Sequence, residues 1–292
     1  MEIVCDNSEL NAGAEAADVL VIGGYAIARD KVSGLLKKVQ DTKSHFGLDP
    51  HCPVKWNLRD LDRALTAHGL LGQKDILIGQ SNPVRKALLD ALTESGATIL
   101  TSVIHAYSGK KQVLGKTKDD LVSYSFGNLL MRAGLFCKEK AGGRRVDVLL
   151  DWPEANNPAP FVSEYHTGWR YGRSGPEGTE VKYECGCLAD LAYAPTTSFA
   201  RTDFDPRLQL ADLVVGATRE FISFALGKVR EDAFGVERFK ALLPHLYARN
   251  GRTLGAGITV SPTMKPLSTC VLEALKKLAS KQRDAATSLK SS

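Results

Sequence analysis

The alternation of apolar and polar positions divides the chain into strand-like and helix-like segments. Residues 2–5 form a short run of β-type side chains, and residues 19–27 form a longer apolar run. Turn formers that begin at Asp6 follow the first run, so the two runs predict an antiparallel hairpin with Asp6 at the end of its first strand. Further strand-like runs, rich in aliphatic and β-branched residues, cover residues 98–107, 146–151 and 188–194.

Helical periodicity separates most of these runs. One helix begins at Asp205-Pro206, an N-cap residue followed by a proline at the first helical position. Its interior is almost wholly apolar, yet it carries one carboxylate, Asp212. Taken together, the predicted helices cover residues 31–46, 57–68, 83–95, 118–139, 159–171, 206–226, 235–248 and 267–282.

The order of these segments predicts an α/β fold. Two strands come first, a helical insertion at residues 30–95 follows, and three further strands alternate with helices. This is the order of the ribonuclease H-like fold, a mixed five-stranded sheet flanked by helices, in which an antiparallel start is followed by parallel strands. We expect this domain to span residues 1–228. Residues 229–292 are expected to form a C-terminal helical extension, packed on the same domain and ending in a basic tail.

Three aspartates occupy the positions where that fold gathers acidic residues. Asp6 follows the first strand, Asp151 ends the fourth, and Asp212 lies in the last helix of the domain. Functional groups of open α/β sheets collect beyond the carboxyl ends of strands. Three carboxylates at one point repel one another unless cations lie between them, and oxygen ligands of this kind select Mg²⁺ or Mn²⁺. The pattern therefore predicts a site for one or two such ions.

Each aspartate also has a structural interpretation. Asp6 fits an Asx-turn that shapes the loop after the first strand, and Asp151 fits a turn or N-cap position. Asp212 needs a cation, a metal or a cavity opposite it, and Arg207 or Arg219 on its own helix could supply the cation. On these interpretations the chain is a structural or interaction protein.

Several short motifs are similar to those of one prokaryotic family. The most specific is Gln209-Leu210-Ala211-Asp212-Leu213, and the others are Asp6-Asn7-Ser8-Glu9, Gly23-Gly24, Val54-Lys55-Trp56 and the strand-terminal Asp151. Through them, residues 2–226 resemble the family catalogued as domain of unknown function 3800. The chain departs from the family pattern at Asn7 and Val54, where the family has acidic residues. Candidate replacement ligands are Asp205, Glu154, Asp119 and Asp120.

The first functional hypothesis is a metal-dependent nuclease, acting by phosphodiester hydrolysis, with RNA as the expected substrate. Ions held by Asp6, Asp151 and Asp212 would activate water and stabilise the leaving oxygen. Lys55 would pair with a phosphate, and Gln209 would position a substrate or a ligand carboxylate. Ser8 and Trp56, which flank these residues in the motifs, are included among the substrate-binding candidates.

The second hypothesis is an RNA-binding protein that is catalytically weak or inactive. Genes of the family are associated with structured non-coding RNAs, so the resemblance implies an RNA–protein particle. The net charge is +5, and basic residues gather in a loop and around aromatic residues, an arrangement suited to phosphates and stacked bases. An ordinary solvated face explains the same residues, which are Lys110, Lys111, Lys116, Trp169, Arg170 and Arg173.

Composition argues against a membrane protein, a secreted protein and a structural zinc site. Hydrophobic residues make up 43% of the chain and charged residues 24%, as in water-soluble globular proteins. We find neither an apolar run of membrane-spanning length nor a signal peptide, so we expect a cytoplasmic protein without a membrane partner. The six cysteines are expected to be free thiols, because Cys185-Gly186-Cys187 lacks the second ligand pair of a structural zinc site. The sequence is compatible with a homo-oligomer.

Overall fold

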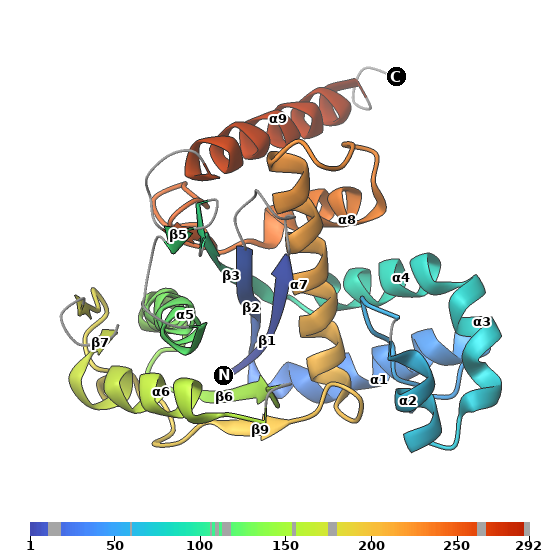
Figure 1. Cartoon of the computed structure of the whole chain (residues 1–292), viewed down its shortest axis with the longest axis horizontal. Coiled ribbons are helices and arrows are strands. Elements are labelled where there is room, and N and C mark those ends of the chain that lie inside the picture. The colour runs from blue at the N-terminus through green and yellow to red at the C-terminus, as the bar shows by residue number, and fades with distance from the viewer. Residues whose placement is uncertain are drawn as a thin grey trace.

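Within the described residues, six strands form the central sheet in the order β10-β3-β2-β1-β6-β9, and Figure 1 labels β3, β2, β1, β6 and β9. They are β1 (Glu2–Leu10), β2 (Val19–Ile27), β3 (Thr98–His105), β6 (Asp147–Asp151), β9 (Ser198–Ala200) and β10 (Ile258–Ser261). This computed structural model describes residues 1–10, 19–58, 60–105, 107–108, 111–112, 118–153, 156–174, 180–261 and 267–288, without the side chains at 9–10, 105–112, 118 and 281–288. The protein is therefore α/β with a mixed sheet.

The pairing is antiparallel for β1 with β2 and for β2 with β3. It is parallel for β1 with β6, β6 with β9 and β10 with β3. The expected count of five strands was wrong, because β10 from the C-terminal extension adds a sixth. The expectation of a strand over residues 188–194 was also wrong. A 3₁₀ turn, η2 (Leu188–Leu191), lies there, and Ala192 at φ 59° ends it before the chain enters β9.

Helices cover both faces of the sheet. The larger helices are α1 (Arg29–His45), α4 (Ser81–Glu94), α5 (Lys118–Lys140), α6 (Ala159–Tyr171), α7 (Pro206–Ala225) and α9 (Leu267–Ser288). The shorter ones are α2 (Leu61–Ala67), α3 (Lys74–Gly79) and α8 (Phe234–Leu242), with the 3₁₀ turns η1 (Leu71–Gln73) and η3 (Leu243–His245). Two small ribbons pair β4 (Tyr107–Ser108) with β5 (Lys111–Gln112) and β7 (Arg173–Ser174) with β8 (Val181–Lys182).

The alternation of side chains along β1 separates two apolar cores. Val4 belongs to the core beneath α7, α1, α4 and α8, whereas Ile3 and Cys5 belong to the core beneath α5 and α6. The same alternation divides β6, where Leu149 faces the first core and Leu150 the second. Because side chains alternate between the faces of a strand, Asp6 lies on the α7 side.

α7 lies close against β1 and β2 (Figure 1). Gly24 allows this approach, because a Cβ atom there would collide with the Val4 carbonyl oxygen and stand 3.2 Å from the Ala211 side chain. The start of α7 confirms its predicted cap, since the Asp205 carboxylate accepts a hydrogen bond from the Arg207 backbone N–H at 2.8 Å. The cap therefore fixes where the helix begins, and Gly24 fixes how closely it packs on the sheet.

All six cysteines are free thiols. Within the described residues, no helix has the length and apolar character needed to cross a membrane.

Candidate active site

Asp6, Asp151 and Asp212 meet where β1, β6 and α7 come together. The parallel pairing of β1 with β6 ends at Cys5 opposite Leu150, so Asp6 and Asp151 are the next residues on adjacent strands, which lie about 4.8 Å apart. Asp6 lies on the α7 side of the sheet, and Asp212 is on α7. The expectation that the first strand ends at Asp6 was wrong: β1 runs on to Leu10, paired with β2 alone.

The charges of the three carboxylates act on one another. Burial raises the pKa of Asp6 well above its ordinary value, and the charges of Asp151 and Asp212 raise it further. Burial also raises the pKa of Asp151, against hydrogen bonds from Thr202 and the charge of Lys55. It raises the pKa of Asp212 to about 6, with Asp151 adding to the effect. A cation at this point would relieve both burial and repulsion.

Backbone N–H groups fix the orientation of all three carboxylates. Each carboxylate has further lone pairs beyond the one that such a bond uses. The bonds run from Asn7 N to Asp6 Oδ1 at 2.6 Å, from Thr202 N to Asp151 Oδ1 at 2.7 Å and from Trp56 N to Asp212 Oδ2 at 2.5 Å.

The sequence predicts that Lys55 contacts a phosphate of the substrate. In the structure Lys55 also forms an ion pair with a carboxylate. Its Nζ atom lies 3.0 Å from Oδ1 of Asp203, whose side chain is only 7% exposed. Burial lowers the pKa of Lys55, but the charges of Asp203, Asp212 and Asp151 outweigh burial and raise it overall. Lys55 is therefore a permanent ammonium shared between Asp203 and the cluster.

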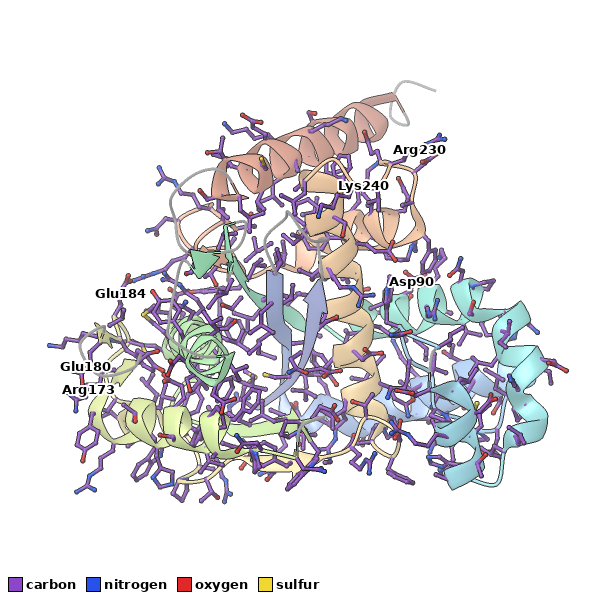
Figure 2. All side chains as sticks on the ribbon, viewed as in Figure 1. Asp90, Arg173, Glu180, Glu184, Arg230 and Lys240 are labelled. Atoms are coloured by element: carbon purple, nitrogen blue, oxygen red, sulfur yellow. The ribbon has the colours of Figure 1, made fainter. Side chains whose placement is uncertain are left out.

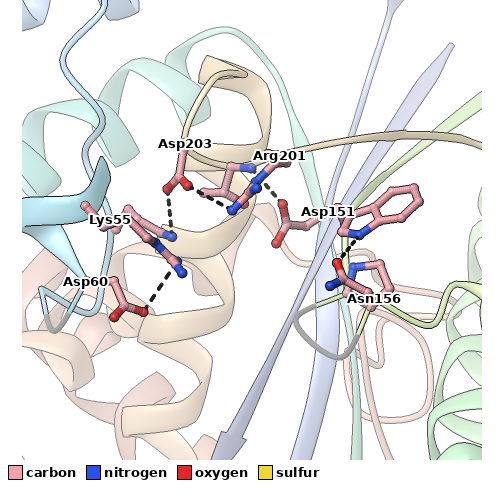
Figure 3. Close-up of a pocket in the computed structure, with 10 residues that line it drawn as sticks. Lys55, Asp60, Asp151, Asn156, Arg201 and Asp203 are labelled. Atoms are coloured by element: carbon pink, nitrogen blue, oxygen red, sulfur yellow. Dashed lines mark hydrogen bonds and ion pairs between the residues drawn. The ribbon is translucent and has the colours of Figure 1, made fainter. Parts of the chain in front are cut away.

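Asp203 is a site residue that no sequence pattern indicated. It lies in the loop between β9 and α7, where no periodic pattern marks a buried carboxylate. Arg201 also approaches it, with Nη2 3.6 Å from Oδ2. Figure 3 shows Lys55 and Arg201 both directed at Asp203, with Asp151 on the side of the sheet. The only available signal was its place two residues before the Asp205 helix cap.

Gln209 positions the Lys55 loop from inside the core. Its side chain is buried, and its Oε1 accepts hydrogen bonds from Lys43 Nζ at 2.8 Å and from the Val54 N–H at 3.3 Å. Lys43 is itself fully buried, and its Nζ donates a second bond to the Pro50 carbonyl at 3.4 Å. The described contacts of Gln209 thus join the core to the Lys55 loop.

Trp56 lies in the core beside the site. Its indole is 7% exposed and stacks on Phe234, with ring centroids 5.8 Å apart. The Arg85 guanidinium lies 5.5 Å from the centre of the indole ring, and it donates to the carbonyls of Lys55 and Trp56. Trp56 therefore holds the loop by packing, while its backbone N–H holds Asp212.

Gly216 on α7 tests this packing. A Cβ atom at Gly216 would overlap the Trp56 indole. We expect Gly216→Ala to displace Trp56, to weaken its bond to Asp212 and to destabilise the fold by about 1–3 kcal/mol, the usual cost of overpacking. Chemical denaturation and Trp fluorescence measure the two effects. Gly79→Ala, on a helix where a Cβ meets open space, is the control, and equal stability of the two variants would contradict the assignment.

A pocket of about 400 Å³ opens beside Asp151 and Lys55. Its walls combine charged groups from the insertion with the segments that follow β6 and β9 (Figure 3). The lining residues are Lys55, Asp60, Arg63, Asp151, Trp152, Pro153, Asn156, Arg201, Thr202 and Asp203. This volume falls in the range of small-molecule and cofactor sites.

The other expected site residues are dispersed. Ser8 accepts a hydrogen bond from Arg219 at 3.0 Å, and the charge of Arg219 lowers the pKa of Asp212, which brings Ser8 near the cluster. Arg207 forms ion pairs with Glu2 and Asp205 rather than with Asp212. Asp205 is occupied in this way and as the helix cap.

The aromatic and basic stretch at the end of α6 is remote from the carboxylates. Trp169 donates its indole N–H to Tyr193 O at 3.1 Å, and Tyr193 pairs with Val146 at the amino end of β6, opposite to Asp151. Arg170 and Arg173 both lie over the Tyr171 ring. Figure 2 shows Arg173 beside Glu180 at this end of α6.

Some expected residues fall outside the described part of the structure, namely Glu154 and the side chains of Lys110, Lys111 and Lys116. Among the candidate replacement ligands that are described, Asp119 accepts a hydrogen bond from Asn157 at 3.2 Å on the surface.

Among the described residues, no group of three or more histidine, cysteine, aspartate or glutamate side chains has the arrangement of a metal site. The donor chemistry nevertheless fits a hard divalent cation, because three oriented carboxylates with raised pKa values lie near enough for their charges to act on one another. Comparison of the chain with protein families, curated proteins and solved structures finds no match.

Proposed function

We propose that this protein is a metal-dependent nuclease with a ribonuclease H-like fold. The proposal agrees with the resemblance of its motifs to the domain of unknown function 3800 family. The single observation that carries the proposal is the convergence of Asp6, Asp151 and Asp212 from β1, β6 and α7, with pKa values that burial and mutual repulsion raise. Clustered carboxylates of this kind beside a pocket are typical of catalytic sites.

The strand arrangement supports the proposed fold. The order β3-β2-β1-β6-β9, antiparallel across the first three strands and parallel across β1, β6 and β9, agrees with the ribonuclease H-like expectation. In that arrangement the acidic residues of the first strand, the fourth strand and the last helix share one site. The segment after β2 contains α1 to α4, which corresponds to the proposed insertion.

Asp6, Asp151 and Asp212 would hold Mg²⁺ or Mn²⁺. When bound, such an ion activates water and stabilises the leaving oxygen of an in-line displacement at phosphorus. Lys55 would contact a phosphate of the substrate. Asp203 orients the ammonium, and Gln209 and Arg85 hold the loop that carries it. A phosphate bound to Lys55 would therefore share the ammonium with the Asp203 carboxylate.

Addition of Mn²⁺ tests the metal site directly. We expect saturating Mn²⁺ to raise the melting temperature by several degrees at pH 7.5, because an ion that binds only the folded state stabilises it. Between about pH 4 and 6 the folded state of Asp212 holds a proton that the unfolded chain has released, so stability without metal falls as pH rises through this window. Mn²⁺ competes with that proton, and its effect should therefore be much smaller at pH 5.

The matched control for this measurement is Asp90→Asn. Asp90 forms a surface pair with Lys86 on α4, so its replacement should leave the Mn²⁺ effect unchanged, whereas Asp212→Asn should remove it. An equal Mn²⁺ effect in wild type and Asp212→Asn, or none at pH 7.5, would contradict the metal site.

One observation favours a second function, RNA binding without hydrolysis. The ammonium of Lys55 already neutralises part of the cluster through its pair with Asp203, which lessens the need for a metal. RNA affinity that falls steeply with salt and is equal in wild type and Asp212→Asn, with no cleavage in Mn²⁺, would support this function over the first.

A further inference from the structure

The residue after Asp151 is an exposed tryptophan. Trp152 is 39% exposed, among the large apolar side chains that are most exposed in the described part of the chain. Trp152 is one of the residues that line the 400 Å³ pocket next to Asp151 and Lys55. The other two tryptophans are packed in or against the cores, so Trp152 differs from them in position and in exposure.

Contacts on several sides hold this indole in place. The Trp152 backbone N–H donates to the Ala200 carbonyl at 2.7 Å, which ties the residue to β9. Its Nε1 donates to Asn156 Oδ1 at 2.9 Å, as the dashed line in Figure 3 shows. Its ring meets the edge of Phe199 at 5.8 Å and an interplanar angle of 76°. An exposed aromatic ring that is already ordered binds a flat ligand with little further loss of entropy.

Two arginines share the pocket with Trp152. Arg63 and Arg201 have side chains that are 66% and 56% exposed, and their nearest carboxylates are at 3.7 Å and 3.6 Å. Such loose, exposed ion pairs contribute little and are readily exchanged for another anion. A guanidinium offers a planar fork of donors that fits phosphate oxygens.

From this combination we propose that the pocket binds single-stranded nucleic acid, with one base stacked on Trp152 and adjacent phosphates bound by Arg63 and Arg201. This rests on the proposed function and adds the strandedness of its substrate. Aromatic rings that stack on bases, together with cationic side chains that contact the backbone, are the usual means of holding single strands, and Trp152 with Arg63 and Arg201 supplies both groups. Bases inside a duplex are stacked on their neighbours, so a duplex offers no free base face to Trp152.

Binding of a short single-stranded RNA oligonucleotide, measured by fluorescence anisotropy in EDTA, tests the proposal. We expect Trp152→Ala to weaken binding by about 5- to 100-fold, the effect of losing one stacked base, and Trp152→Phe to retain most of the affinity. The duplex of the same sequence should bind more weakly and should be indifferent to both substitutions. Arg201→Gln should weaken single-strand binding and lower its salt dependence.

Quenching of protein fluorescence provides the second readout. Single-stranded RNA should quench the emission of wild type and of the surface control Asp90→Asn, but not that of Trp152→Ala. Unchanged affinity in Trp152→Ala, equal sensitivity of the duplex, or no binding of single strands would overturn the inference. These assays contain no divalent ion, so Mn²⁺ stabilisation without single-strand binding would leave the metal site standing and remove only this inference. Single-strand binding that depends on Trp152, without any stabilisation by Mn²⁺, would leave this inference standing and remove the metal site.

Discussion

Asp212→Asn is expected to reduce Mn²⁺-dependent cleavage at least about hundredfold and, in the absence of metal, to make the protein more stable. Loss of groups that merely support a ligand costs about 10- to 100-fold, so loss of a ligand should reach the upper end of that range. Asparagine keeps an oxygen acceptor for the Trp56 N–H but removes a charge whose pKa is raised to about 6. At pH 7.5 this removal should stabilise the fold by roughly 1–3 kcal/mol.

Cleavage of end-labelled RNA in Mn²⁺ and urea denaturation in EDTA measure the two effects. Asp90→Asn, on the surface of α4, should change neither of them. Cleavage at the wild-type rate in Asp212→Asn would end the nuclease proposal, and reduced stability would show that Asp212 serves the fold. The opposite signs of the two effects separate a functional carboxylate from a structural one.

Gln209→Leu is expected to destabilise the protein by about 3 kcal/mol. Lys43 is fully buried, and the substitution removes the acceptor of its shortest hydrogen bond, which leaves a charge buried with one weaker acceptor at 3.4 Å. Burial lowers the pKa of Lys43 to about 8, so the ammonium depends on its protein acceptors for the solvation that water would give it. The Val54 N–H loses the same acceptor, and the Lys55 loop should loosen with it.

The double variant Lys43→Met/Gln209→Leu is the control for this mechanism. Removing the charge together with its acceptor should recover a large part of the loss, because apolar pairs of similar shape replace buried polar pairs at little cost. Urea denaturation of the two single variants and the double variant gives the coupling. Additive losses in the double variant would show that Lys43 and Gln209 act independently.

Local patterns were sufficient for the elements that carry the fold. The apolar run at residues 19–27 matches β2, and Asp205-Pro206 marks the start of α7 as predicted. Prediction was wrong where an apolar pattern does not imply a strand, as in residues 188–194: Leu188 is buried from a 3₁₀ turn, and Tyr193 forms a single bridge to Val146. It missed β10 because four residues after a glycine-rich turn give too short a pattern.

In the candidate site, too, sequence patterns indicate some residues and miss the contacts among others. The neighbouring positions of Asp6 and Asp151 follow from the pairing of β1 with β6, and strand order indicates such a pairing in sequence, whereas the place of Asp212 was expected from the proposed fold. The contacts around them join residues far apart in the chain, so no local pattern reveals them. Lys55 meets Asp203 across 148 positions, and Gln209 meets Lys43 across 166. Trp152 was overlooked for a different reason: it follows a strand-terminal aspartate in a turn, and only the surrounding pocket distinguishes it.

The pairing of β10 with β3 also bears on how the chain is made. The Thr101 N–H donates to the Gly257 carbonyl across 156 positions, so β3 remains without its outer neighbour until the last strand has been synthesised. At about 5–20 residues per second, translation of that interval takes on the order of ten seconds or more. During this time β3 presents an open edge to other nascent chains, and we expect chaperone dependence and aggregation to be greatest for ribosome-bound chains arrested between these two strands.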